Sequence, residues 1–355
     1  MAPLLEVKNL CVCVKKDGRS FNILNDVSFF VNEGEIAGLA GESGCGKSMT
    51  ALSITNLLPQ AVRITSGEII YNRDFSKTSE PKVRAFRKAT LDLNTQNLTS
   101  LGEKELRAVR GSEISYVFQD VRQALNPLMK IGKQITETLE LGVRGHRSET
   151  REQKINNKAL ALDLLKALGF NNPQKIFDAY PHQLSGGMCQ RIMTAIAVIG
   201  NPKLLLADEP SSSLDEESQN QCLSLLLKKN QNEKMSLFVI SHDLSIIQNF
   251  CSRFIIMYAG RIAEEGQAET LFSPLHPYTR ALVNALPYKN KRGQNLENIG
   301  GKVPSVEDQL KGCPFAPRCP KAQNICKETF PPDYFNSKDN QRKVYCYFPE
   351  QIKKM

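Results

Sequence analysis

The feature that most constrains this chain is a glycine-rich turn between an apolar run and a helical pattern. Residues 41–48 read Gly-Glu-Ser-Gly-Cys-Gly-Lys-Ser and fit G-x-x-x-x-G-K-[S/T]. The apolar run 36–40 before them is typical of a buried strand, and residues 49–58 after them look helical. Glycines let backbone N–H groups turn towards phosphate oxygens, and the helix directs its positive end at them. The sequence therefore predicts a strand, a phosphate-binding loop and a helix in succession.

The residues of this loop are expected to share the binding of a nucleotide. Lys47 supplies a positive charge to the β- and γ-phosphates, and the Ser48 hydroxyl is offered to Mg²⁺. Cys45 is interpreted as a tolerated small residue, with an oxidation point as the alternative. The predicted nucleotide-binding residues of the loop are Gly41, Ser43, Gly44, Cys45, Gly46, Lys47, Ser48 and Met49.

A second constellation lies where an apolar run ends in two acids. Residues 204–209 read Leu-Leu-Leu-Ala-Asp-Glu. An acid at a strand end holds Mg²⁺ through water, which suits Asp208, and Glu209 suits a general base that activates the attacking water. A lone Asp-Glu pair is usually a solvated turn, but a phosphate-binding loop in the same chain favours the catalytic interpretation.

The apolar segments predict the fold class. Residues 204–207 and 237–240 read as short buried strands between helical stretches, which favours a largely parallel α/β core. Residues 4–7 and 10–14 are strand-like, and Asp17-Gly18 marks a hairpin turn. Residues 73–95 are polar and mixed in charge, and we interpret them as an insertion.

Length, charge and the lengths of the apolar runs limit the number of domains and the class of protein. A chain of 355 residues predicts roughly two domains. Its net charge of +9 is interpreted as a basic soluble surface, with nucleic acid or an anionic membrane face as alternatives. No apolar run reaches ~18 residues and the first ten residues lack a signal-peptide pattern, so we expect neither a membrane crossing nor secretion.

Four of the ten cysteines crowd into the C-terminal part, namely Cys313, Cys319, Cys326 and Cys346. Structural zinc sites usually show close C-x₂₋₄-C pairs, and this spacing has none. Four thiolates can hold an iron–sulfur cluster, with proline beside the ligands. We expect a cluster here, and zinc or unligated thiols are the alternatives. Disulfides are not expected in a chain without a secretion signal.

The order of further motifs resembles the ATP-binding cassette (ABC) family. Residues 184–188, Leu-Ser-Gly-Gly-Met, resemble its signature LSGGQ, with Met in place of the final Gln. Residues 118–120 (Phe-Gln-Asp) resemble the Q-loop, 213–215 (Ser-Leu-Asp) the D-loop and 241–243 (Ser-His-Asp) the switch region. The family's usual aromatic partner for adenine would fall near Val14, which has no ring, and Phe21 is a possible substitute.

The resemblance implies roles for these positions. Gln119 would contact Mg²⁺ or the attacking water, and His242 would hold the γ-phosphate. The signature would complete the ATP site of a partner subunit, and Asp215 would bridge the two sites. The implied catalytic residues are Glu209, His242 and Gln119, the Mg²⁺ ligands are Ser48, Gln119 and Asp208, and the partner-site residues are Ser185, Gly186, Gly187 and Asp215.

Other segments resemble the ATPase subunits of bacterial dipeptide and oligopeptide importers. These segments are 124–127 (Ala-Leu-Asn-Pro), 257–261 (Met-Tyr-Ala-Gly-Arg), 276–279 (His-Pro-Tyr-Thr), 300–304 (Gly-Gly-Lys-Val-Pro) and the four-cysteine tail. The resemblance covers about residues 4–349. It implies an α/β P-loop cassette over 1–285, with an antiparallel β subdomain and a helical subdomain at about 120–200. A small Cys-rich module over 286–355 would follow, which in some members binds a [4Fe–4S] cluster.

The resemblance also implies partners and a place in the cell. The partners would be a homologous second ATPase subunit, two integral membrane permease subunits and an extracytoplasmic peptide-binding protein, with no nucleic acid. The chain would be peripheral, on the cytoplasmic face of the inner membrane, and would use ATP and Mg²⁺. The alternatives are a nickel-importer ATPase and a soluble ABC ATPase that acts on ribosomes or DNA.

Overall fold

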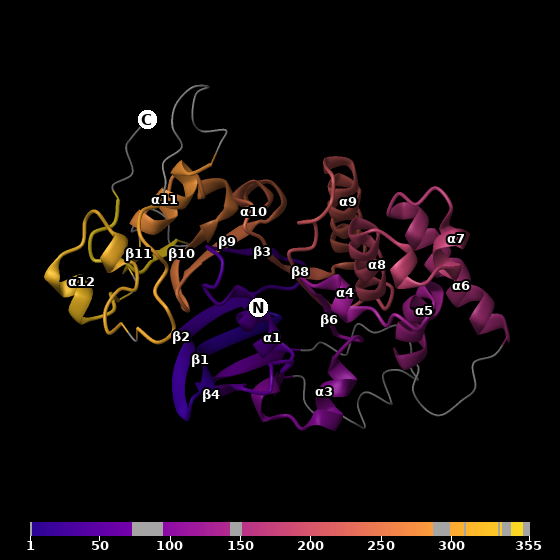
Figure 1. Cartoon of the computed structure of the whole chain (residues 1–355), viewed down its shortest axis with the longest axis horizontal. Helices are drawn as coiled ribbons and strands as arrows, with labels where there is room; N and C mark the ends of the chain where they lie inside the picture. The colour runs from indigo at the N-terminus through magenta and orange to yellow at the C-terminus, as the bar shows by residue number, and fades with distance from the viewer. Residues whose placement is uncertain are drawn as a thin grey trace. The chain divides into compact units, whose positions relative to one another are not determined.

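A computed structural model describes residues 2–72, 95–142, 151–286, 299–308, 310–332, 334–335 and 342–350 (Figure 1). The chain forms two compact units. The first consists of Met1–Leu5, Val31–Glu35 and Ile70–Val239, and the second of Glu6–Phe30, Ile36–Ile69 and Ile240–Met355. The expected insertion, residues 73–95, lies outside the described residues except for Thr95.

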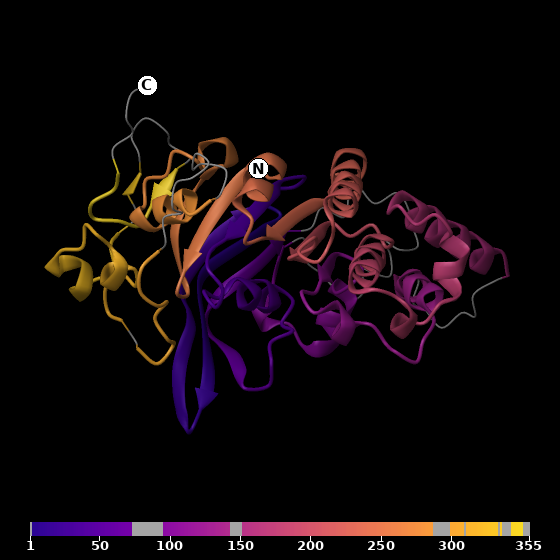
Figure 2. The ribbon, with the colours of Figure 1, turned by 45° about the horizontal axis from the view of Figure 1, so that its top comes forward.

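The second unit begins with a long hairpin, which both views show (Figures 1 and 2). Strands β1 (Leu5–Lys16) and β2 (Arg19–Val31) meet at Asp17 and Gly18, whose φ angles are 49° and 73°. Two successive positive φ angles suit a two-residue hairpin turn, so the turn predicted from Asp17-Gly18 is confirmed. Strand β4 (Val62–Asn72) follows β1 in the order of this sheet.

The rest of the second unit is built on a buried strand pair. Strand β3 (Ile36–Ala40) is buried throughout and runs parallel to β9 (Arg253–Tyr258). Strand β10 (Arg261–Gln267) pairs antiparallel with β9, β12 (Lys343–Val344) with β10, and β11 (Tyr334–Phe335) with β12. The helices here are α1 (Lys47–Ile54), α10 (Leu244–Phe250), η4 (Ala268–Thr270), α11 (Pro277–Asn284), η6 (Ala316–Arg318) and α12 (Asn324–Glu328). The C-terminal segment therefore adds strands to the edge of the sheet that contains β3, the strand that leads into the phosphate-binding loop.

The first unit carries its own strands and a run of helices. Strands β6 (Ile114–Val117) and β7 (Leu204–Asp208) are buried and parallel, and β8 (Ser236–Ile240) neighbours β7. Strand β5 (Thr95–Asn97) pairs antiparallel with the end of β4 and leads into η2 (Leu98–Ser100) and α3 (Glu103–Val109). Parallel β6 and β7 agree with the α/β class predicted from the apolar runs.

Helices fill the stretch between β6 and β7. They are α4 (Val121–Ala124), α5 (Ile131–Gly142), α6 (Arg151–Ala167), α7 (Pro173–Asp178), η3 (Pro181–Gln183) and α8 (Gly186–Val198). Helices α5, α6 and α7 pack against one another, and both views show them together (Figures 1 and 2). Helix α9 (Glu216–Glu233) follows β7. Within the described ranges, no helix has the length and apolar character needed to span a bilayer.

Candidate functional site: a phosphate-binding loop, a carboxylate pair and a cysteine cavity

The glycine-rich loop connects β3 to α1, as predicted. Gly46 caps the helix with a φ of 103°, a left-handed conformation that favours glycine. A Cβ atom on Gly41 would lie 2.2 Å from the carbonyl oxygen of Met257, so the loop passes too close to β9 for any side chain. The loop therefore needs glycine at both positions for steric reasons.

The Lys47 ammonium lies over the loop itself. Its Nζ donates hydrogen bonds to the carbonyl oxygens of Gly41 at 2.8 Å and Glu42 at 2.9 Å. Ser48 follows in the first turn of α1, while Ser43 and Gly44 are exposed. A cation, exposed loop atoms and a helix N-terminus together form a surface suited to phosphate.

Cys45 is a packing residue in this loop. Its side chain is 1% exposed, and burial raises the pKa of the thiol although Lys47 acts in the opposite direction. A buried neutral thiol is a poor nucleophile, which supports the interpretation as a tolerated small residue.

The switch segment belongs to the same unit as the loop. The N–H of Ser241 donates to the carbonyl oxygen of Leu39 at 3.1 Å, so this segment starts beside the strand that enters the phosphate-binding loop. His242 is exposed, and Asp243 caps α10 by accepting the N–H of Ser245 at 2.8 Å. The hydrogen bonds of Ser241 and Asp243 therefore hold the backbone on either side of His242.

The first unit contains the two acids. Asp208 is the last residue of β7 and is 3% exposed, and the Tyr116 hydroxyl donates to its Oδ2 at 3.1 Å. Burial first, and the negative Asp208 second, raise the pKa of Tyr116, so this phenol stays a donor at neutral pH. Glu209 follows with a φ of 53°, which is uncommon for a residue with a side chain. Such strained backbone concentrates at functional sites.

Gln190, in α8, holds the segment that carries Glu209. Its side chain is 1% exposed, and its Nε2 donates to the carbonyl oxygen of Glu209 at 2.6 Å. Its Oε1 accepts hydrogen bonds from the N–H, at 3.2 Å, and the hydroxyl of Ser213. One buried amide thus ties the signature helix to the general-base candidate and to the start of the predicted D-loop.

The signature residues form the N-terminus of α8. Ser185 is the N-cap and accepts the N–H of Met188 at 3.3 Å, and Gly186 and Gly187 open the first turn. The space beyond Gly186 is open, with no atom within 4 Å of where a Cβ would lie. The segment is therefore an exposed helix start of the kind that binds phosphate.

Asp215 and Gln119 lie at two other helix starts of the first unit. Asp215 caps α9, and the N–H of Ser218 lowers the pKa of its carboxyl group. Gln119 is exposed between β6 and Asp120, and Asp120 caps α4. The first unit therefore contains Gln119, Asp208, Glu209, Asp215 and the signature, and the second contains the phosphate-binding loop and His242.

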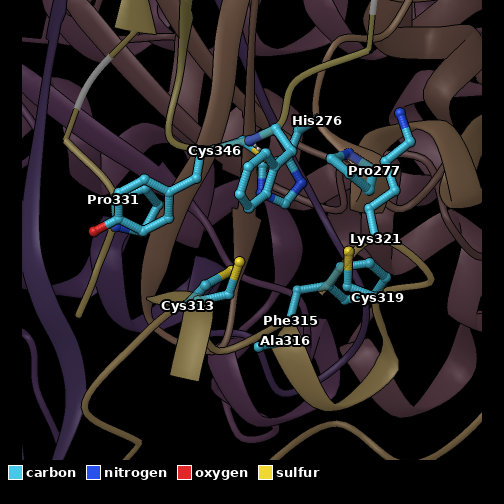
Figure 3. Close-up of a pocket in the computed structure, with 12 residues that line it drawn as sticks. His276, Pro277, Cys313, Phe315, Ala316, Cys319, Lys321, Pro331 and Cys346 are labelled. Carbon is cyan, nitrogen blue, oxygen red and sulfur yellow. Dashed lines mark hydrogen bonds between the residues drawn. The ribbon is translucent and has the colours of Figure 1, made fainter. Parts of the chain in front are cut away.

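The four C-terminal cysteines line one cavity of the second unit. It has about 320 Å³ of space free of protein atoms, part of it open to solvent, and is also lined by His276 and Phe315. Figure 3 shows Cys313, Cys319 and Cys346 around this space. His276 is buried, and its Nδ1 accepts the N–H of Tyr278 at 3.0 Å. Over the described parts of the chain, no group of three or more His, Cys, Asp or Glu side chains is arranged ready to hold a metal ion.

The thiols that line this cavity influence one another. Burial raises the pKa of Cys313 to about 11 and of Cys346 to about 12, and the charges of neighbouring cysteines add to both shifts. Thiols that influence one another electrostatically are close, and a metal would replace their protons. These raised pKa values keep Cys313 and Cys346 as neutral thiols at neutral pH.

Four buried polar contacts around these residues were not predicted from the sequence. They involve Tyr116, Gln190, Tyr278 and Arg318, which are buried polar side chains aimed at backbone or carboxylate atoms. Tyr116, Gln190 and Arg318 stand outside the quoted motifs, and Tyr278, although it belongs to the segment 276–279, was given no role from the sequence.

A loop for phosphate, a buried strand ending in two carboxylates and a glycine-opened signature helix define a nucleotide-hydrolysing protein of the P-loop class. The chain belongs to the ABC transporter family, because residues 24–212 match the family model described as ABC transporter. Residues 263–326 match the model described as oligopeptide/dipeptide transporter, C-terminal region. Both matches confirm the family predicted from the motifs.

Curated relatives extend this similarity over nearly the whole chain. The dipeptide transport ATP-binding protein DppD of Escherichia coli is 37% identical over 98% of this chain and 97% of its own. The oligopeptide transport ATP-binding protein AppD of Bacillus subtilis is 37% identical over 99% and 98%. Among solved structures, the dimeric ATP-binding cassette MJ0796 bound to ADP and Pi matches with a TM-score of 0.61 and 26% identity. It covers 74% of this chain and 98% of that one.

Proposed function

We propose that this chain is the ATP-hydrolysing subunit that powers import of dipeptides or oligopeptides through a membrane ABC transporter. The observation that carries the proposal is end-to-end similarity to peptide-transport ATP-binding proteins, including the C-terminal region named after oligopeptide and dipeptide transporters. The cassette domain would span 1–285, with its helical subdomain at about 120–200, and the Cys-rich module 286–355.

We assign the steps of ATP hydrolysis to the residues that the family motifs mark. Lys47 and the N–H groups of the loop bind the β- and γ-phosphates, and Glu209 takes a proton from the attacking water. His242 and Gln119 orient the γ-phosphate and that water. Ser48, Asp208 and Gln119 would hold Mg²⁺, which neutralises charge on the phosphates.

The signature is proposed to act on a partner's nucleotide. Ser185, Gly186 and Gly187 present an exposed helix start, and Asp215 lies at the start of the next helix of the same unit. The partner would be a homologous second ATPase subunit, in a heterodimer. Two permease subunits and an extracytoplasmic peptide-binding protein would complete the importer, with this chain peripheral on the cytoplasmic side.

The four cysteines are proposed to hold a [4Fe–4S] cluster. All four line one cavity, which supports a common binding site. The engaged Nδ1 of His276 favours an all-thiolate set over a mixed one. Such a cluster would supply a covalent cross-link between distant parts of the C-terminal segment.

The proposed function is tested by uptake into membrane vesicles that contain the complete transporter. Labelled dipeptide and tripeptide should accumulate inside the vesicles when ATP is present on the side of the ATPase subunits. They should not accumulate when the transporter contains the Glu209→Gln chain. Uptake of nickel without uptake of peptide would instead identify the chain as a nickel-importer ATPase. Co-purification with ribosomes or DNA, without co-purification of permease subunits in detergent, would identify a soluble ABC ATPase.

A further inference from the structure

Arg318 connects the phosphate-binding loop to the Cys-rich segment, the C-terminal part of the chain that contains Cys313, Cys319, Cys326 and Cys346. It lies in η6, the short helix between Cys313 and Cys319, and its side chain is 4% exposed. Its Nη1 donates to Oε2 of Glu42 at 2.7 Å, and its Nη2 donates to Oε1 at 3.1 Å. Glu42 is the second residue of the loop, so the contact is a bidentate ion pair between the two segments.

The remaining contacts of the guanidinium leave it little freedom. Nε donates to the carbonyl oxygen of Gly300 at 2.7 Å, and Nη2 to that of Ile299 at 3.0 Å. Nη1 also donates to the Tyr258 hydroxyl at 3.0 Å. Because all three nitrogens have partners fixed in other elements, Arg318 holds the Glu42 carboxylate in one place.

Glu42 is held at its backbone as well. Its N–H donates to the Tyr278 hydroxyl at 2.8 Å, and Tyr278 is fully buried. The Tyr278 ring packs on Tyr258 and Phe315, with centroids 4.5 and 5.3 Å away. The carbonyl oxygen of Glu42 accepts the Lys47 ammonium, so the position of Glu42 also determines where this lysine lies.

We infer that Arg318 is a positioning residue of the nucleotide site: it fixes and neutralises Glu42, and thereby makes the geometry of the phosphate-binding loop depend on the fold of the Cys-rich segment. Arg318 acts through Glu42 and need not touch the nucleotide. Without it, the Glu42 carboxylate in the phosphate-binding loop loses its counter-charge, and the loop loses its ion pair with the C-terminal segment. Both changes weaken the binding of an anion.

The test measures MgATP binding to the full-length chain by titration calorimetry, with hydrogen exchange of the loop 41–48. Arg318→Ala should weaken MgATP affinity by about ten-fold, the loss expected when hydrogen bonds to a charged group are removed. Arg318→Lys should restore only part of the MgATP affinity, because one ammonium group cannot replace the bidentate contact. The loop amides should exchange faster in Arg318→Ala, and those of β7 should not.

Two further variants separate positioning from a general loss of structure. In Arg318→Ala/Glu42→Gln, affinity should be no weaker than in Arg318→Ala alone, because both substitutions break the same ion pair. Arg280→Ala is the matched control, since Arg280 pairs with Glu350 at 2.7 Å on an exposed surface of the same unit. It should bind MgATP like the wild type.

Each outcome has one meaning. Equal affinity of Arg318→Ala and the wild type overturns the inference, and so does a double variant that is weaker by the product of the single effects. If Arg318→Ala does not fold, Arg318→Lys and Glu42→Gln decide, and wild-type affinity in both overturns it. A wild-type chain that binds no MgATP refutes the proposed function itself, which keeps the two failures distinct.

Discussion

The side-chain amide of Gln190 donates a 2.6 Å hydrogen bond to the backbone carbonyl oxygen of Glu209, while the same side chain accepts the N–H of Ser213. Glu209 has a left-handed φ of 53°, and a buried donor on its carbonyl helps to hold that conformation. The helix that begins with the signature therefore fixes the residue predicted to activate water.

Replacing Gln190 should slow hydrolysis more than it weakens binding. In Gln190→Leu the volume is nearly kept, but the Glu209 carbonyl loses its donor and the carboxylate is no longer held in place. We expect the turnover of the assembled transporter to fall by up to about 100-fold, the effect of a small misplacement of a catalytic group. Steady-state phosphate release and MgATP affinity would be measured together. Gln174→Ala, an exposed glutamine of α7, is the control, and full turnover in Gln190→Leu would contradict the role.

Glu209→Gln should remove hydrolysis and preserve nucleotide binding. The amide cannot accept a proton from water, so the rate should fall by about 10²- to 10⁴-fold. Phosphate release would be followed in the assembled transporter, and MgATP affinity in the isolated chain. Glu216→Gln is the matched control, because Glu216 is exposed in the first turn of α9. Hydrolysis by Glu209→Gln at the wild-type rate would show that another group is the base.

The cysteine cavity should contain iron after anaerobic purification. A [4Fe–4S] cluster predicts about four irons and four acid-labile sulfides per chain. Cys313→Ser should lose them, because it removes one thiolate of the set. Cys11→Ser removes a thiol of β1 that does not line this cavity, and should keep the full content. Zinc alone, or no metal in the wild type, would refute the cluster and leave the ABC ATPase assignment intact.

Acid should destabilise the chain partly through His276. Burial lowers the pKa of this imidazole from 6.5 to about 4, so the folded chain keeps it neutral where the unfolded chain protonates it. Its contribution to stability is therefore present above pH 6.5 and is lost as the pH falls from 6.5 to 4. At pH 5 the loss amounts to about 2 kcal/mol relative to pH 7.5.

Chemical unfolding of wild type and His276→Asn at pH 7.5 and 5 measures this contribution. Asparagine can still cap α11, where His276 accepts the N–H of Tyr278, but it does not titrate. The variant should lose less stability between the two pH values. The same pH dependence in both proteins would assign the acid effect to other groups.

Much of the nucleotide machinery could be predicted from local patterns. Residues 41–48 and 204–209 sit where predicted, between β3 and α1 and at the end of β7, because these segments combine buried strands with turn or helix-start residues. The boundaries shifted by a few residues: the helix expected over 49–58 is α1, Lys47–Ile54. Helix α3, in a stretch without clear periodicity, was not predicted.

The sequence by itself determined the phosphate-binding loop, the carboxylate pair and the family, since each depends on residues adjacent along the chain. Only the tertiary structure decided which distant side chains support them. Arg318 lies 276 residues from Glu42, and Gln190 lies 19 from Glu209. Arginine and glutamine are ordinary surface residues in any sequence, and they acquire a role here because folding buries them against charged or backbone partners. Such contacts follow from packing, which no local pattern encodes.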